Sequence, residues 1–200
     1  MAAGWRTIFV DAGEDGLEMW ACNETPLEGD GEPSSRMSRS LARLSRFVRK
    51  DGNSPWRAAG QWAYPVGKLH GGAFRGVKQR GVADLCVLPD GTLLVLEREF
   101  SWRVMPCFRS RVYQVSFKGA SDVSACENLT ADGIVPVIRR RLWASDTAFA
   151  NYEGMCLGKR LADGTRALLL VSDGDGYASE RFYVFKLDVQ EDEPRADDRR

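Results

Sequence analysis

Two segments of the chain repeat one another, and this internal repeat limits the possible folds more than any other feature. The segments are residues 81–99 (GVADLCVLPDGTLLVLERE) and residues 151–173 (NYEGMCLGKRLADGTRALLLVSD). In each, an acidic residue opens a short apolar run, an Asp-Gly turn follows, and a second apolar run ends on a carboxylate. Asp84 and Glu153, which open the two copies, are 69 residues apart. This distance is typical of a four-stranded antiparallel unit with its loops, and such units bury their faces by stacking.

A third, more degenerate copy lies upstream of these two. Residues 6–10 form an apolar run before the Asp15-Gly16 turn, and residues 17–24 (LEMWACNE) repeat the strand that ends on a carboxylate. Three copies in the same register make chance a poor explanation. We therefore expect the chain to be built throughout from one kind of β unit.

The remaining strands of each unit are indicated by period-two alternation of apolar residues. The third strand is residues 111–117 in the second copy and residues 181–188 in the third, and both begin with arginine. The fourth strand is weaker, and we place it at residues 134–143 and, in the first copy, at residues 57–64. Pro136 lies inside this expected strand, which suits an outer edge where a missing N–H is tolerated.

One segment carries two competing patterns. Met37, Leu41, Leu44 and Val48 are spaced four, three and four residues apart, which is typical of an amphipathic helix over residues 38–49. The repeat instead puts the third strand of the first copy here, and the letters ARLSRF within the segment also alternate. We favour the strand, because tertiary context overrides weak local propensity.

Four antiparallel strands per unit, repeated along the chain, predict an all-β protein made of β-propeller blades. We expect three blades, at about residues 5–66, 81–145 and 151–188, within one partial propeller domain of residues 1–188, followed by a charged tail of residues 189–200. A closed ring typically needs four to eight blades. The chain is therefore either a piece of a longer protein or one subunit of an assembly, and truncation is the simpler account because the third copy stops after three strands.

Composition narrows the class of partner. The formal net charge is zero, so no basic excess points to nucleic acid or to an anionic membrane surface. No apolar run approaches the roughly 20 residues needed to span a bilayer, and residues 1–6 lack the apolar core of a signal peptide. We expect neither a nucleic acid nor a membrane as partner.

The thiols and the single imidazole point to structural roles. The cysteines contain no Cys-x-x-Cys spacing, and three of them lie inside expected strands, so we expect buried thiols in preference to a zinc site or disulfides. The five are Cys22, Cys86, Cys107, Cys126 and Cys156. His70 is the only histidine, which excludes a catalytic triad or a multi-histidine metal site within this chain.

The motifs together resemble the phytase-like domain family, which is described as having esterase-like activity. The resemblance rests on residues 81–98, 151–155 and 168–175, with residues 20–31 similar to the preceding blade, and it covers the chain from about residue 17 to residue 187. It implies a hydrolase that acts on a phosphoester or ester bond of a small molecule. Members of the family are longer than this chain and are commonly exported behind a signal peptide.

Carboxylates recur at equivalent places in the three copies. In a propeller blade the start of the first strand and the end of the second strand emerge on the same face, so these acids are expected to surround one mouth of the central channel. They are Asp84, Glu97, Glu153, Asp173 and, from the first copy, Glu24, or Asn23 if the register slips by one residue.

Clustered carboxylates repel one another unless a positive charge lies among them. Oxygen ligands without histidine or thiolate select a hard cation, calcium before magnesium, and such a metal polarises a phosphoryl oxygen and activates water. Residues near the cluster then have expected roles. Glu97, Asp173, Asp84 and Glu24 are the expected calcium ligands, Glu153 is the expected catalytic residue, and Arg98, Arg75 and Lys78 are expected to hold substrate oxygens.

Two functions from different classes stay open. The first is a metal-dependent phosphoester or ester hydrolase. The second is a propeller that serves as a binding platform, in which the carboxylates bind backbone N–H groups or arginines, because this fold hosts many unrelated functions. A serine esterase is the weakest enzyme hypothesis, since the chain has no Gly-x-Ser-x-Gly motif. Open blade edges at both ends further predict self-association.

Overall fold

A computed structural model describes residues 5–11, 16–70, 78–102, 106–148, 150–174 and 180–188. Within these ranges the backbone forms eleven β-strands and no helix, as the prediction of an all-β protein required. No helix in this part of the chain is therefore long and apolar enough to cross a membrane.

The strands form three antiparallel sheets, each a simple up-and-down meander in chain order. Sheet A contains β1 (Trp5–Asp11), β2 (Leu17–Asn23), β3 (Ser40–Arg49) and β4 (Arg57–Val66). Sheet B contains β5 (Lys78–Val87), β6 (Leu93–Trp102), β7 (Pro106–Ser116) and β8 (Ile138–Ala148). Sheet C contains β9 (Asn151–Arg160), β10 (Arg166–Asp173) and β11 (Phe182–Leu187).

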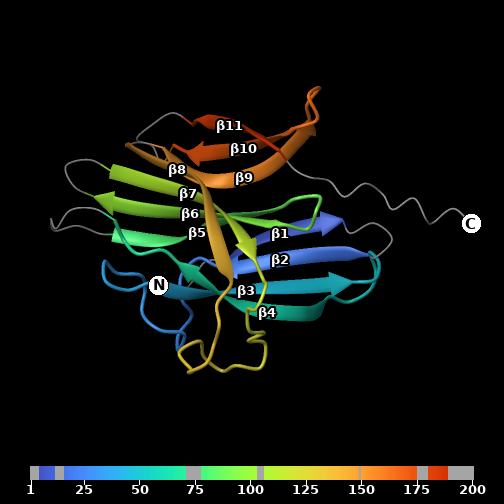
Figure 1. Cartoon of the computed structure of the whole chain (residues 1–200), viewed down its shortest axis with the longest axis vertical. Helices are drawn as coiled ribbons and strands as arrows, with labels where there is room; N and C mark the ends of the chain where they lie inside the picture. Colours follow the sequence, from blue (N-terminus) through green and yellow to red (C-terminus); the bar gives the residue numbers. More distant parts are fainter. Residues whose placement is uncertain are drawn as a thin grey trace, which may run out of the picture.

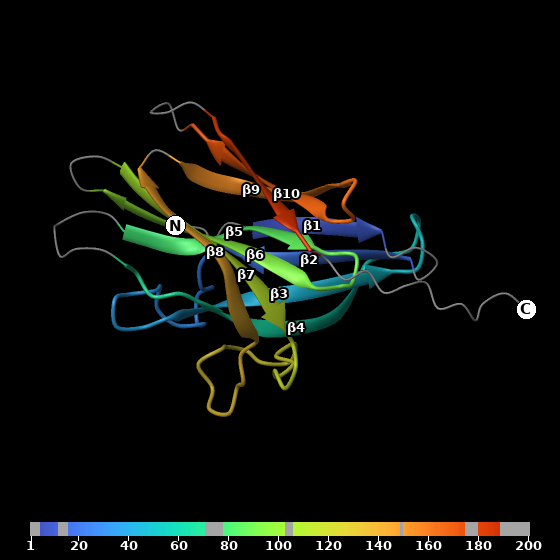
Figure 2. The ribbon, with the colours of Figure 1, turned by 45° about the horizontal axis from the view of Figure 1, so that its top comes forward.

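The sheets lie one above another, with sheet B in the middle (Figures 1 and 2). Their first strands are neighbours, because β5 contacts both β1 and β9. The three similar segments of the sequence thus lie in three different sheets, which meet along their first strands.

The segment with two competing patterns is a strand. β3 pairs with β2 on one side and with β4 on the other, so the strand prediction is confirmed and the helical pattern was misleading. The alternation of side chains between the two faces of the sheet explains why this segment is a strand. Ala42 and Leu44 are completely buried in the core shared with sheet B, while Arg43 points to the opposite face of the sheet.

Two strand boundaries differ from those expected. β8 begins at Ile138, so Pro136 precedes the strand instead of lying in it, and it interrupts no ladder hydrogen bond. β5 begins at Lys78 and β6 continues to Trp102, so Asp84 does not open its strand and Glu97 does not close its strand. Both carboxylates lie in strand interiors, where the direction of each side chain is set by the pleat.

The strand β6 divides the core into two layers. Leu93 and Val95 pack against sheet A, and Leu94 and Leu96 pack against sheet C. All four are fully buried, which explains why this strand has a continuous apolar run where a half-exposed strand would alternate. The same alternation continues into the charged half of β6 and decides which sheet each charge faces.

The long connection between β7 and β8 crosses to sheet A and covers the outer edge of β4. Val123 N donates to Gln61 O at 2.7 Å, and Val137 N donates to Ala63 O at 3.0 Å. Val123 and Leu129 pack with Ala63 in a small separate core. This connection is the yellow loop below β4 in Figures 1 and 2.

A buried arginine fastens the connection to sheet A. The Arg43 guanidinium forms a two-point ion pair with Asp30, at 2.7 and 2.8 Å, and donates to the backbone carbonyls of Cys126 and Glu127, each at 3.1 Å. Leu129 N in turn donates to Asp30 Oδ1 at 3.0 Å. Sheet A and the connection from sheet B are therefore joined by a saturated, charge-assisted set of hydrogen bonds.

Candidate functional site at the junction of the three sheets

Four polar side chains meet where β2 ends, β9 begins and β6 passes. Arg98 Nη2 lies 3.0 Å from Glu24 Oε1, and Arg98 Nη1 lies 3.0 Å from Glu153 Oε1 and 3.2 Å from Asn151 Oδ1. We call Arg98, Glu24, Asn151 and Glu153 the Arg98 cluster. Each of the three sheets contributes to it, and three of its members were predicted from the sequence as site residues.

The backbone brings these side chains together in a specific way. Gly81 of β5 pairs with Arg98, and the chain after β2 crosses over this glycine so that Glu24 O accepts a hydrogen bond from Val82 N at 3.1 Å. A Cβ atom on Gly81 would lie 2.4 Å from Glu24 O, so any larger residue would push Glu24 away. The glycine therefore sets how closely Glu24 approaches Arg98.

On the side of sheet C, Asn151 and Glu153 lie at the start of β9, where its pairing with β10 has an irregularity. Asn151 Nδ2 donates to Glu153 Oε1 at 2.9 Å, which holds the carboxylate toward Arg98. Because Asn151 also accepts from Arg98, the amide orients both charged groups. This role of Asn151 was not predicted, since one asparagine before the acidic residue carries no distinguishing signal in the sequence.

The Arg98 cluster is half-buried. The side chains of Arg98, Glu24 and Glu153 are 18%, 16% and 28% exposed, so solvent reaches them. A guanidinium between two carboxylates offers hydrogen-bond donors for an oxyanion and, on either side, a carboxylate that can accept a proton.

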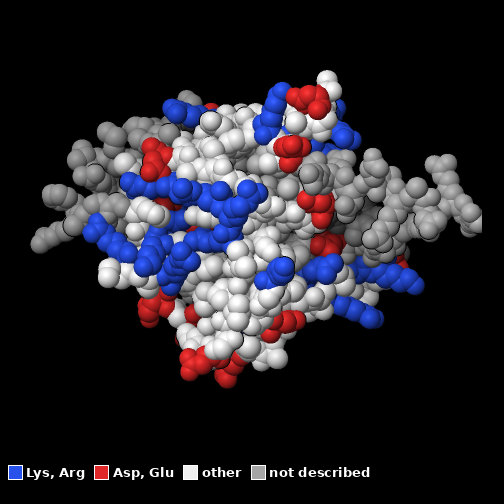
Figure 3. Space-filling model, viewed as in Figure 1, with Lys and Arg blue, Asp and Glu red and all other residues white. Residues whose placement is uncertain are grey.

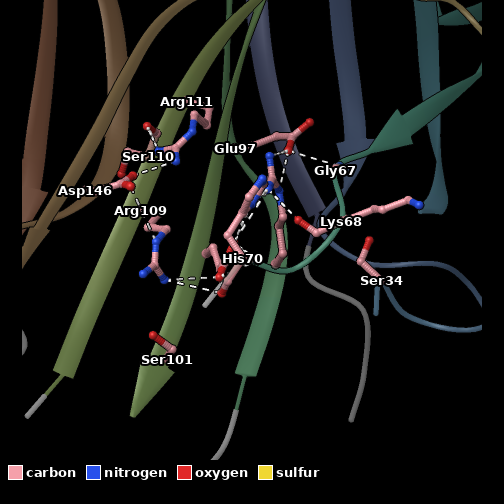
Figure 4. A network of polar contacts seen from close by, with 12 residues as sticks. Ser34, Gly67, Lys68, His70, Glu97, Ser101, Arg109, Ser110, Arg111 and Asp146 are labelled. Atoms are coloured by element: carbon pink, nitrogen blue, oxygen red, sulfur yellow. Dashed lines mark hydrogen bonds and ion pairs between the residues drawn. The ribbon is translucent and has the colours of Figure 1, made fainter. Parts of the chain in front are cut away.

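Glu97 belongs to a different environment. Its side chain is 0% exposed and faces sheet A, and it accepts hydrogen bonds from Tyr64, Gly67, Arg80 and Arg139. Figure 4 shows it beside Gly67, turned away from Arg109 and His70. We expected Glu97 at the rim with the other acids, but it is buried against sheet A. Glu97 and Arg98 are adjacent in β6, and adjacent residues of a strand point to opposite faces, so the two side chains cannot share one site.

These neighbours, with Tyr113, form what we call the Glu97 network. The Arg80 guanidinium lies against the Cα of Gly67, where a Cβ atom would come within 2.3 Å of it, and Arg80 Nη2 donates to Tyr113 Oη at 3.2 Å. Burial, and then the negative charge of Glu97, raise the pKa of the Tyr64 hydroxyl well above its ordinary value. Tyr64 is therefore a hydrogen-bond donor at neutral pH.

Glu99 extends the polar contacts toward the surface and engages the only histidine. His70 N donates to both carboxylate oxygens of Glu99 at 2.9 and 3.0 Å, and Arg109 Nη1 lies 3.3 Å from Glu99 Oε1. Arg80 Nη1 lies 2.8 Å from His70 Nδ1. The same Nδ1 lies 3.2 Å from Glu99 Oε2, so the His70 ring contacts both Arg80 and Glu99. No local motif in the sequence marks this contact of His70.

The other predicted residues are not members of the Arg98 cluster, and one of them lies outside the described ranges. Asp84 accepts hydrogen bonds from Leu85 N at 2.8 Å and from Met155 N at 2.6 Å, so it joins β5 to β9. Asp173 ends β10 opposite Asn151 and is exposed. Arg75 lies outside the described residues, and so does the side chain of Lys78.

The described residues do not fit the expected calcium site. Among them no group of three or more His, Cys, Asp or Glu side chains is close enough to hold a metal ion. Glu97 faces another sheet, Asp84 binds backbone N–H groups, and the guanidinium of Arg98 lies between Glu24 and Glu153, where a cation would bind both. Calcium binding stays a prediction.

The five thiols differ in environment. All are free; Cys22 and Cys86 are buried, Cys107 and Cys126 are half-buried, and Cys156 is exposed. Burial, followed by the nearby Glu97, raises the pKa of Cys22, and burial followed by Asp84 raises the pKa of Cys86 to about 12. These two thiols stay protonated at neutral pH and pack as small apolar groups.

Comparison with known proteins adds one finding. A family model described as "Phytase-like: Esterase-like activity of phytase" matches residues 10–176. No curated protein and no solved structure matches the chain. The match runs from the end of β1 past the end of β10, so it includes strands of all three sheets but not β11, and every member of the Arg98 cluster lies within it.

Proposed function

Because the chain belongs to the phytase-like family, a family described by the esterase-like activity of phytase, we propose that it acts as a hydrolase on phosphoester or ester bonds. The substrate in this proposal is a small molecule. The Arg98 cluster is the proposed site, and the observation that supports it is the half-buried guanidinium held between two carboxylates from different sheets.

We propose further that the three sheets are blades of a β-propeller. Each sheet is an antiparallel meander, and the first strands are neighbours, as the inner strands of blades are. In this arrangement the Arg98 cluster lies near the propeller axis, at the end of the channel where β2 and β10 end and β9 begins.

The chemistry follows from the residues of the cluster. An anionic oxygen of a phosphoester, or the carbonyl oxygen of an ester, takes the place of one carboxylate on Arg98, which then stabilises the charge that develops on it. Glu153, held by Asn151, accepts a proton from the attacking water. That proton then goes to the leaving oxygen, so the products are an acid and an alcohol. No step of this scheme uses a metal, because the described residues do not fit one.

Turnover of p-nitrophenyl phosphate and p-nitrophenyl acetate by the full chain tests the proposal. Glu153→Gln keeps the shape but removes the base, so we expect kcat to fall by about a hundredfold or more at an unchanged melting temperature. Arg98→Met should raise KM for the phosphate more than for the acetate, because only the phosphate is charged. Glu28→Gln, at an exposed site, is the control. Wild-type turnover by Glu153→Gln would exclude Glu153 as the base.

A non-catalytic binding platform is the second candidate, and one observation favours it. The buried carboxylate Glu97 is saturated by two arginines, a tyrosine and a backbone N–H, and Asp84 binds backbone N–H groups, as structural carboxylates do. If neither ester is hydrolysed by the wild-type chain, this second candidate replaces the hydrolase.

A further inference from the structure

A pocket lined by arginines lies on the outer side of the molecule, at the junction of sheets A and B. It has a volume of about 480 Å³. Its lining contains three arginines, one tyrosine, three apolar residues and no acidic residue. These are Arg39, Pro65, Tyr113, Val137, Ile138, Arg139 and Arg141, and we call the space they surround the arginine pocket.

Strand alternation explains why the charges converge. Arg139 and Arg141 are two residues apart on β8, and both line the pocket on the side of sheet A. Arg140 points to the other face of the strand, where its guanidinium donates to Gln114 Oε1 at 2.6 Å. Arg39 immediately precedes β3 and approaches the same space from sheet A. Figure 3 shows the area of Lys and Arg side chains over β7 and β8.

Arg139 forms a rigid wall of the pocket. Its side chain is 10% exposed, and it is an ion pair partner of the fully buried Glu97. Its guanidinium carbon lies 4.3 Å from the centre of the Tyr113 ring and 5.7 Å from that of Tyr64, so two aromatic faces also hold it. A guanidinium fixed in this way loses little conformational freedom when a ligand binds.

Arg39 and Arg141 are different, because both are exposed and neither forms a hydrogen bond or ion pair with the described residues. Glu97 neutralises one positive charge at most, and it already shares its carboxylate between Arg80 and Arg139. The pocket thus keeps a surplus of positive charge although the chain as a whole has a net charge of zero. A local surplus at a concave surface attracts anions.

We propose that the arginine pocket binds the dianionic head of a small phosphomonoester. Guanidinium groups bind phosphate oxygens through paired charge-assisted hydrogen bonds. The three arginines of the pocket carry more positive charge than the single carboxylate of Glu97 can neutralise. Pro65, Val137 and Ile138 offer apolar surface to the organic part of the ligand. This site is separate from the Arg98 cluster, whose residues line the junction of all three sheets and not the pocket.

Calorimetric titration of the full chain with glycerol 2-phosphate and with inorganic phosphate, at constant ionic strength, tests this inference. We expect saturable binding of both, tighter for the ester because it also contacts the apolar lining. The double variant Arg39→Gln with Arg141→Gln should weaken both affinities by about tenfold or more. Both residues are exposed, so the melting temperature should stay within about 2 °C of the wild type.

The control carries the same change in net charge at other places. Arg57→Gln with Arg140→Gln removes two exposed arginines outside the pocket lining and should leave both affinities unchanged. Equal weakening by the two double variants would mean non-specific attraction and would overturn the proposal. Loss of binding in Arg98→Met but not in Arg39→Gln with Arg141→Gln would move the anion to the Arg98 cluster and would also overturn it. So would the absence of saturable binding to the wild type.

Discussion

Arg80 Nη2 lies 2.7 Å from Glu97 Oε2, and the two side chains are 2% and 0% exposed. An ion pair this deeply buried persists only when both charges keep their remaining hydrogen bonds, and here the two tyrosines, Gly67 and Arg139 supply them. The Glu97 network is therefore the polar centre of the contact between sheets A and B.

Replacement of Glu97 by glutamine should destabilise the fold strongly. Arg80 and Arg139 would keep buried positive charges without a counter-charge, which typically costs about 3–5 kcal/mol. The free energy of unfolding, measured by urea denaturation, checks this. Glu28→Gln, on an exposed side chain, should change that free energy by less than about 0.5 kcal/mol. A loss below about 1 kcal/mol in Glu97→Gln would show that the network does not hold the two sheets together.

Gly81→Ala should disturb the Arg98 cluster through the backbone. The new Cβ atom would lie 2.4 Å from Glu24 O, so the segment after β2 must move, at a cost of about 1–3 kcal/mol. Hydrolysis should fall together with stability, because Gly81 pairs with Arg98 and a shift of this backbone moves Arg98 relative to Glu153. Gly52→Ala is the matched control, since no atom lies within 4 Å of its Cβ position. If both variants melt like the wild type, the approach of Glu24 to Gly81 is looser than described.

Arg98 should determine whether calcium binds. In the wild type its guanidinium neutralises Glu24 and Glu153, so calcium and chelator should give the same melting temperature. In Arg98→Met the two carboxylates repel one another, and calcium becomes the available counter-charge. At a hundredfold excess over Kd, calcium should then stabilise this variant by about 2.7 kcal/mol. Calcium-dependent melting of the wild type itself would instead support the metal ligands predicted from the sequence.

The buried thiols should make the fold sensitive to alkali. The pKa of Cys86 rises from 9.0 to about 12 on folding, so its contribution is complete below pH 9 and is lost as the pH rises toward 12. Above pH 9 the unfolded chain releases a proton that the folded chain retains, at up to about 1.4 kcal/mol for each pH unit. Thermal melts from pH 8 to 11 should therefore show a flatter decline in Cys86→Ala than in the wild type. Cys107→Ala, at a half-buried thiol, is the comparison, and equal slopes in all three proteins would argue against this effect.

The free face of sheet C should cause the chain to associate with a second copy. Phe182 and Val184 are 70% and 59% exposed on neighbouring positions of β11, next to the exposed Val171 of β10. Light scattering should show oligomers, and Val184→Lys should shift them toward monomer. Met37→Lys changes an equally apolar residue that is 84% exposed in a loop, and it should leave the size unchanged. A monomeric wild type would contradict this prediction.

Period-two alternation and the repeat predicted the β class and nearly every strand, including β3, whose helical spacing was coincidental. The alternation could not show which face of β6 looks toward which sheet. Glu97 and Arg98 are adjacent, and only the packing of Leu93 and Val95 against sheet A decides that Glu97 is buried there. A bulge between Val82 and Asp84 also shifts the pairing of β5 with β6, so Asp84 lies opposite Leu96 and faces sheet C, whereas Glu97 faces sheet A.

The repeat in the sequence also made part of the Arg98 cluster predictable. Glu24 and Glu153 were marked by carboxylates that recur at equivalent positions of the repeat, and Arg98 was marked by its place next to Glu97. Asn151, His70 and the arginine pocket were not, because their partners come from other sheets and no local motif records such contacts. Arg39, for example, is 100 residues from Arg139 in the sequence and meets it only when sheets A and B pack.

The anchoring of the β7–β8 connection on sheet A has a consequence for the order of folding. Asp30 and Leu129, which it joins, are separated by 99 residues. On the ribosome Arg43 and Asp30 are made early, whereas the carbonyls of Cys126 and Glu127 appear only after β7 has been synthesised. Arg43 and Asp30 on sheet A therefore lack these hydrogen-bond partners until most of sheet B has been synthesised. Contacts between residues so far apart in the sequence also form slowly. Once they form, the two sheets must open together, so amides in β3 and in β7 should exchange with solvent at the same rate.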